Sequence, residues 1–163
     1  MAGTPIWQIE GVALESAGAA VVGSLAYRIL RMYDDTNQPV LVYPTLAAGA
    51  TVASAATDWD LGNLAEVVPA NTIASIFLVQ LIIVETMSKD GVFELVLYSG
   101  AGDAEVGRIR FSYIGGFFGN SVFRVPGILV AANSRIRAAL ACSDGLAGAA
   151  TATISIAYRV VAV

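Results

Sequence analysis

Strict alternation of apolar and polar residues constrains the fold of this chain more than any other feature. Residues 92–98 place Phe93, Leu95 and Leu97 on one face, and residues 105–113 alternate in the same way. Alternation over this length indicates a half-buried β-strand. The linker between the two stretches, SGAGD, is short and contains glycine. The sequence therefore predicts an antiparallel hairpin at this point.

Further strand patterns lie on both sides of this hairpin. Residues 76–84 form a continuous apolar run, which is typical of a strand buried on both faces. Residues 134–142 and 151–161 alternate again, and residues 25–33 and 40–43 flank the loop sequence DDTNQ, which predicts a second hairpin. Eight or so short strands separated by turn signals predict an all-β chain that forms a β-sandwich, a jelly roll or a barrel. Of these we expect an antiparallel β-sandwich with a jelly-roll-like arrangement.

Only one stretch competes as a helix. Residues 11–23 are rich in alanine, but Gly11, Gly18 and Gly23 would each cost about 1 kcal/mol in a helix interior relative to alanine. We therefore expect at most one short helix. No shift in composition divides residues 1–163, so the sequence predicts a single domain.

Charged residues are scarce. Asp, Glu, Lys and Arg make up 13% of the 163 residues, against about 25% in an ordinary soluble domain. Either Ser, Thr, Asn and Gly replace the missing charges on the folded surface, or neighbouring subunits cover much of that surface. The second interpretation predicts an oligomer. Nine Lys and Arg against 13 Asp and Glu disfavour nucleic-acid binding, which needs a basic patch.

An apolar composition can also indicate a membrane protein, but the apolar stretches are too short. Residues 67–84 carry no charge, yet Pro69, Asn71 and Gln80 interrupt them, and a membrane-spanning helix needs about 20 predominantly apolar residues. Residues 1–10 contain neither Lys nor Arg nor a long apolar run. The sequence thus predicts no membrane segment and no signal peptide.

Residue types exclude the commonest catalytic arrangements. The chain has no histidine, so Ser-His-Asp and Cys-His sites are excluded. Cys142 is the single cysteine, so an intrachain disulfide or a cysteine-based zinc site is excluded as well. We expect no cofactor and no enzymatic activity.

Carboxylates provide the remaining chemistry. Asp58 and Asp60 flank Trp59 and would suit the acid and nucleophile of a hydrolase, or a cation site that Asp34 and Asp35 could also form. No EF-hand spacing is present, and pairs of acids in loops are common. Solvated turns are therefore the favoured interpretation.

Two arginine pairs and two aromatic sites are candidate interface residues. Arg108 with Arg110, and Arg135 with Arg137, each place two cations on one strand face. They either face solvent or pair with acidic groups of a neighbouring subunit, because arginine is favoured at interfaces.

The aromatic candidates lie in loop-like settings. Phe117 and Phe118 stand between two glycine-containing dipeptides, at a tip that either folds back on the core or anchors a partner. Trp7 and Ile9 lie within residues 1–10, an arm that could add as a strand to an adjacent subunit.

A recurring order of residues joins two of the predicted strands. The segment VFRVPGILVAANSRIRAALACS runs from a strand into Pro126, then an apolar stretch, two alanines, Asn133 and Arg135. With FELVLYSGAGDAEVGRIRFSYIGG before it and TATISIAYRV after it, the pattern resembles the small β-sandwich structural proteins of tailed-bacteriophage virions, over about residues 76–163. That family usually has glycine where this chain has Asn133. Because asparagine adopts positive φ readily, we expect the turn to be preserved.

This resemblance implies a non-enzymatic virion subunit, made in the host cytoplasm, of the capsid cement or decoration type. Its partners would be the major capsid protein or other virion proteins, and it would form a homo-oligomer, with a trimer as the first expectation for a decoration role. A carbohydrate- or receptor-binding β-sandwich module is the alternative, with Trp7, Trp59 or the tip at Phe117 and Phe118 in its binding site. A carboxylate-dependent hydrolase using Asp58 and Asp60 is the third possibility.

Overall fold

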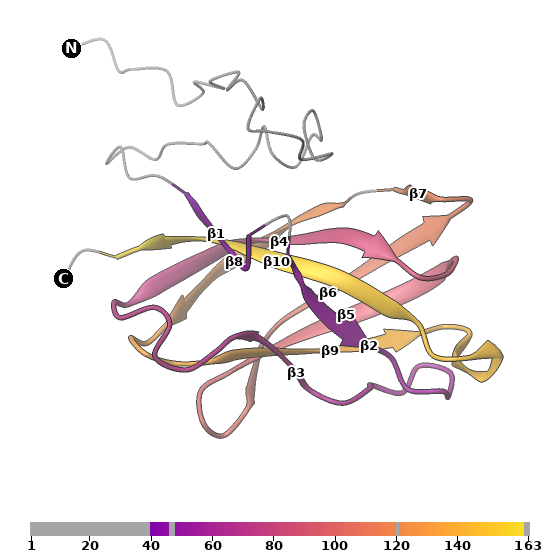
Figure 1. Cartoon of the computed structure of the whole chain (residues 1–163), viewed down its shortest axis with the longest axis horizontal. Coiled ribbons are helices and arrows are strands. Elements are labelled where there is room, and N and C mark those ends of the chain that lie inside the picture. The colour runs from indigo at the N-terminus through magenta and orange to yellow at the C-terminus, as the bar shows by residue number, and fades with distance from the viewer. Residues whose placement is uncertain (1–39, 46–47, 120, 162–163) are drawn as a thin grey trace, which may run out of the picture.

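A computed structural model describes residues 40–45, 48–119 and 121–161, and strands dominate this part of the chain (Figure 1). The strands are β1 (Leu41–Tyr43), β2 (Ala50–Ala53), β3 (Ala65–Val68), β4 (Phe77–Met87), β5 (Gly91–Ser99), β6 (Ala104–Ile114), β7 (Phe117–Phe118), β8 (Val122–Val130), β9 (Ile136–Cys142) and β10 (Thr151–Val160). One short 3₁₀ helix, η1 (Gly145–Ala147), completes the described elements. The predicted all-β class is confirmed. The possible helix at 11–23 and the predicted strand at 25–33 lie outside the described residues.

The strands form two antiparallel sheets. Sheet A has the order β1–β10–β4–β8, with β2 also paired to β10, and sheet B has the order β3–β9–β5–β6–β7. From β2 onward the chain passes from one sheet to the other at every connection except the β5–β6–β7 meander. Two facing sheets wound in this way form a jelly roll. The predicted jelly-roll-like sandwich is therefore confirmed.

The predicted central hairpin is β5 and β6. Phe93 lies opposite Phe111 and Leu95 opposite Ile109, and all four side chains belong to the core between the sheets. The strand β5 differs from the half-buried strand predicted for it, because Val96 on its outer face is also fully buried. It lies between β9 and β6, whose side chains cover it on both flanks.

The apolar run predicted at 76–84 is β4, which continues to Met87 before the turn at 88–90. Its inner face contributes Phe77 and Ile82 to the core. On its outer face, Ile83 packs in a second, smaller apolar cluster with Ala157 of β10. The expectation that this strand is buried on both faces is confirmed.

The strand β8 pairs with β4 and forms one edge of sheet A. Their register is interrupted between Val79 and Leu81, opposite the part of β8 that holds Pro126 and Gly127. Proline has no N–H to give to a ladder, and Gly127 has a φ of 37°. This combination of proline and a break in pairing is typical of an edge strand.

The turn between β8 and β9 confirms the expectation about Asn133. Its φ is 61°, and its backbone N–H donates to Ile73 O at 2.8 Å. Its own carbonyl oxygen accepts the N–H of Asn71 at 3.0 Å. The left-handed residue therefore holds the β3–β4 connection against the β8–β9 turn.

Substitution of Asn133 tests this local requirement. The Asn133→Ala variant is expected to lose about 1 kcal/mol of unfolding free energy, because a Cβ with no local hydrogen-bonding group is disfavoured in the left-handed region. The Asn133→Gly variant should stay within about 0.5 kcal/mol of the original, since glycine adopts this φ freely but also loosens the unfolded chain. Urea unfolding of both variants measures the difference, and equal losses would contradict the role assigned to φ.

Candidate functional site: an interaction surface on sheet B

The outer face of sheet B carries an ion-paired cluster centred on Glu94. The side chain of Glu94 is only 8% exposed and receives Arg108 on Oε1 and Arg110 on Oε2. Arg108 also donates from Nε and Nη2 to the two oxygens of Glu105, at 3.1 and 2.9 Å. Cross-strand register explains the arrangement, because Glu94 lies opposite Arg110 and Val96 lies opposite Arg108.

The two guanidinium groups stabilise the charged form of Glu94. The hydrogen bond from Arg110 is the main cause that holds the pKa of Glu94 below its ordinary value, against the opposing effect of burial. Charge-assisted hydrogen bonds of this kind are stronger than neutral ones. Both sequence-predicted arginines of β6 are therefore paired with carboxylates of their own chain.

Trp59 extends this cluster across the sheet. Its backbone N–H donates to Cys142 O at the margin of β9, while its ring centroid lies 5.2 Å from Cζ of Arg110 on β6. Because β5 lies between β9 and β6, the indole reaches from the edge of β9 across the outer face of the sheet to Arg110. A guanidinium over an indole is a favourable cation–π contact.

Two glycines hold the loop that carries Trp59. A Cβ on Gly62 would lie 2.0 Å from Ala53 O, and a Cβ on Gly145 would lie 2.2 Å from Thr57 O. Both approaches are far below van der Waals contact. The loop therefore needs glycine at these two positions. Trp59 itself has a φ of 61°, which is rare for a bulky residue and shows that the surrounding contacts fix its conformation.

The second arginine pair surrounds Asp103 in the β5–β6 loop. Arg135 donates to the carbonyl oxygens of Gly100 and Ala101, at 3.2 and 3.0 Å, and reaches both oxygens of Asp103. Arg137 donates to Asp103 Oδ2 at 2.7 Å. The two arginines fasten the loop to β9. Both arginines thus form ion pairs with a carboxylate of their own chain.

The two predicted tip aromatics, Phe117 and Phe118, lie in different environments. Phe118 packs against Tyr113, with ring centroids 4.7 Å apart, whereas Phe117 is 78% exposed. Ile114, directly opposite Phe117, is 64% exposed. Phe118 thus folds back on the core, whereas Phe117 projects into solvent.

Further exposed apolar side chains gather at this end of the sandwich. We call it the tip end and define it as residues 114–118 of the β6–β7 hairpin together with residues 54–64, 88–92 and 143–150. Six of the eight exposed large apolar residues in the described part of the chain lie here: Trp59, Leu61, Val92, Ile114, Phe117 and Leu146. Backbone hydrogen bonds connect the loops that carry them, from Ser143 N to Val92 O and from Trp59 N to Cys142 O.

The predicted carboxylates Asp58 and Asp60 lie in an exposed turn of the tip end. Asp58 Oδ1 accepts the backbone N–H of Leu146 at 2.9 Å and so holds η1 against this turn. Within residues 40–45, 48–119 and 121–161, no three His, Cys, Asp or Glu side chains group closely enough to hold a metal ion. Asp58 therefore has a structural contact within this exposed turn, as a solvated turn would provide.

Glu85 and Ser155 form a separate polar pair on the outer face of sheet A. The Ser155 hydroxyl donates to Glu85 Oε1 at 2.7 Å, and burial, more than this hydrogen bond, raises the pKa of Glu85 above its ordinary value. Ser155 is fully buried. The pair therefore joins β4 to β10 without presenting the hydroxyl to solvent.

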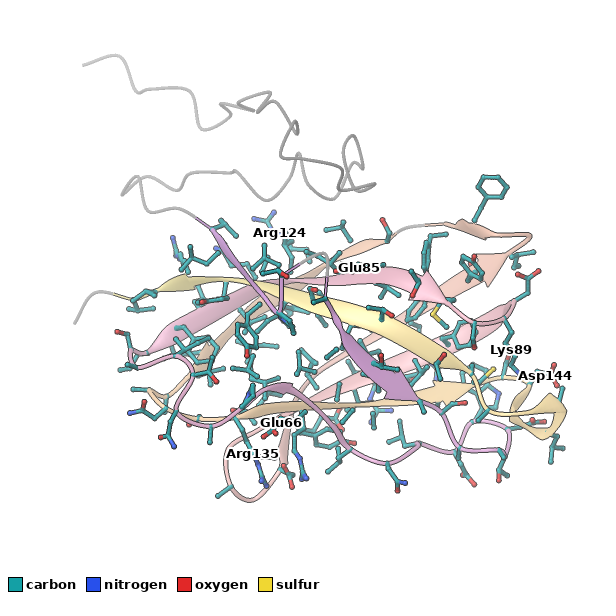
Figure 2. All side chains as sticks on the ribbon, viewed as in Figure 1. Glu66, Glu85, Lys89, Arg124, Arg135 and Asp144 are labelled. Atoms are coloured by element: carbon teal, nitrogen blue, oxygen red, sulfur yellow. The ribbon has the colours of Figure 1, made fainter. Side chains whose placement is uncertain are left out.

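Figure 2 shows where some of the charged side chains lie on the sandwich. Lys89 and Asp144 lie at the tip end, while Arg135 and Glu66 lie on the sheet B side toward the other end. Lys89 Nζ donates to the carbonyl oxygens of Asp144 and Gly148, which closes the loop around η1. The candidate residues Trp7, Ile9, Asp34 and Asp35 lie outside the described residues.

Comparisons with known proteins add little to this geometry. No family model and no curated protein matches the chain. Among solved structures, a chain titled "Structure of infectious bursal disease virus Gx strain" matches with a TM-score of 0.38 and 18% identity, over 79% of this chain and 33% of that one. The chain thus spans about a third of the length of that viral chain. In the part of the molecule that the structure covers, no helix has the length and apolar character to cross a membrane.

Proposed function

We propose that this chain is a non-enzymatic structural subunit of a virus particle, of the tailed-phage cement or decoration type, that stabilises the head through contacts with neighbouring subunits. The observation that carries the proposal is the gathering of exposed apolar side chains at the tip end, with Phe117 and Leu146 the most exposed. Large exposed apolar side chains concentrated at one end of a fold are typical of protein–protein contact sites.

The internal pairing of charges supports the same role. Arg108, Arg110, Arg135 and Arg137 all form ion pairs with carboxylates of this chain, so the outer face of sheet B presents few unpaired charges. A face of this kind can be covered by a neighbour without leaving an uncompensated buried charge, which would be strongly unfavourable. The jelly-roll fold is also one that capsid proteins use, although lectins and cupins use it too.

Particles grown with and without the gene for this chain test the proposal. We expect purified particles to contain the protein in a fixed ratio to the major capsid protein, and particles that lack it to release their nucleic acid at a lower temperature. Light scattering of the isolated protein should report a homo-oligomer, with a trimer as the first expectation.

Absence of the protein from purified particles would contradict this function. Retention of the protein on a glycan array, lost in the Trp59→Ala variant, would instead support the carbohydrate-binding alternative. The exposed indole of Trp59 favours that alternative over a hydrolase, because an aromatic face with a polar neighbour is suited to stacking.

A further inference from the structure

The tip end combines its apolar side chains with a negative charge. Four exposed aspartates lie in its loops, namely Asp58, Asp60, Asp90 and Asp144. The single cation in these loops, Lys89, is half-buried and its ammonium is bound by two backbone carbonyl oxygens. With four aspartates against one lysine, these loops carry a net negative charge beside the projecting Phe117 and Leu146, where Asp90 contacts the β6–β7 turn and Asp58 contacts Leu146.

The projecting part of the tip end is held in place. Asp90 Oδ2 accepts the N–H of Gly115 at 2.7 Å, which fixes the β6–β7 turn to the β4–β5 turn. Ring contacts continue from Phe118 to Phe111 and from Phe111 to Phe93, with centroids 6.4 and 5.5 Å apart. Phe117 therefore projects from a supported hairpin, so little conformational freedom of the backbone would be lost when it binds a partner.

We propose that the tip end docks into an apolar socket, bordered by lysine or arginine, on a different protein of the same particle. The proposal rests on the proposed function, since it names the surface by which the subunit would attach. Phe117 would fill the socket, and the four aspartates would face the basic border. Such an arrangement gives a central aromatic anchor within a charged rim, which is the usual anatomy of a specific interface.

Charge complementarity favours a different protein over a second copy of this chain. The described arginines at 108, 110, 135 and 137 are already bound to carboxylates of their own chain, and Lys89 is bound by carbonyl oxygens. Among the described residues the exposed Arg124 of β8 is not held in this way, but one arginine cannot face four aspartates, so a second copy would still have to break some of these pairs. A partner with unpaired basic residues would meet no such cost.

Sedimentation of the protein with particles that lack it tests this surface. Purified protein is added to particles from the deletion genome, and the bound fraction is measured against concentration at low and high salt. The Phe117→Ser variant should bind at least about tenfold more weakly, as expected for an anchor residue. The matched control is Leu129→Ser, because Leu129 is 65% exposed but lies on β8, outside the tip end.

The charged rim is tested by a double substitution of Asp60→Asn and Asp144→Asn. The changes remove two charges while keeping side-chain size. This variant should bind several-fold more weakly at low salt and lose less affinity as salt is raised, because rim charges are screened by ions. Circular dichroism and urea unfolding of every variant confirm that the fold is kept.

Each outcome has a distinct meaning. Failure of the unaltered protein to bind the particles would overturn the proposed function. Binding of the unaltered protein with no loss in Phe117→Ser would overturn the docking inference alone. If Phe117→Ser lowers the oligomeric state of the free protein and leaves particle binding unchanged, the tip end contacts a second copy, and the inference is also overturned.

Discussion

Replacing Phe93 with alanine is expected to lower the free energy of unfolding by about 3 to 5 kcal/mol, the usual cost of removing a fully buried phenylalanine. Phe93 has no exposed surface and stacks on Phe111, with centroids 5.5 Å apart. The change would leave a cavity beneath the β5–β6 hairpin. The matched replacement of Phe117 with alanine should change stability by less than about 0.5 kcal/mol, since that ring contributes little to the core.

Urea unfolding followed by tryptophan fluorescence measures both variants, and the slope of the transition shows whether the unfolded state is comparable. A large loss in Phe117→Ala would mean that this ring packs against its own chain. It would then be unavailable to a partner, and the surface described at the tip end would need to be redrawn.

Replacing Glu94 with glutamine should give the second largest effect, a loss of about 1 to 2 kcal/mol at neutral pH. Hydrogen bonds to charged groups contribute about 1.5 to 3 kcal/mol, and the exposure of Arg108 and Arg110 reduces this figure through solvation. Glutamine has nearly the same shape but carries no charge. The control is Glu105→Gln, which should lose much less because Glu105 is exposed and contacts Arg108 alone.

The pH dependence provides an independent check on Glu94. Its pKa is lower in the folded protein than the ordinary value of 4.5, so its stabilising effect is complete above pH 4.5. The effect is lost as the pH falls through the folded pKa. The stability curves of the original protein and of Glu94→Gln should therefore converge in acid, and a constant gap between them at all pH values would contradict the ion-pair explanation.

The strands were predictable because alternation is a local property of the sequence. The hairpin of β5 and β6, the buried strand β4 and the alternating strands β9 and β10 all follow from the spacing of their apolar residues. The positive φ of Asn133 was predictable as well, since few side chains tolerate it. The burial of Val96 was not, because it depends on which strands flank β5.

The ion pair of Glu94 with Arg110 is predictable from the sequence of the hairpin. Glu94 and Arg110 both occupy the polar face of the predicted hairpin, and their opposite positions follow from counting back through the loop. The contacts of Arg135 with Asp103 had no such signal. The two residues are far apart in the sequence and meet only because β9 lies beside β5 in the sheet.

The different environments of Phe117 and Phe118 depend on the type of turn. Gly115 and Gly116 both have positive φ, 62° and 82°, as a two-residue hairpin turn of type I′ requires. This turn places Ile114 directly opposite Phe117, so that both side chains share one face. A Gly-Gly dipeptide between apolar residues is a signal for this turn, and the sequence interpretation treated it only as a loop.

Pro126 is expected to reduce aggregation of this protein at high concentration. An edge strand has unpaired backbone N–H and C=O groups and can pair with the same edge strand of another molecule. Repetition of that pairing produces fibrous aggregates. In this protein β8 is such an edge strand, and Pro126 with the break in pairing beside it interrupts β8 at its middle. The chain carries few charges, so electrostatic repulsion between its copies is weak. Along β8, backbone geometry protects it from aggregation instead.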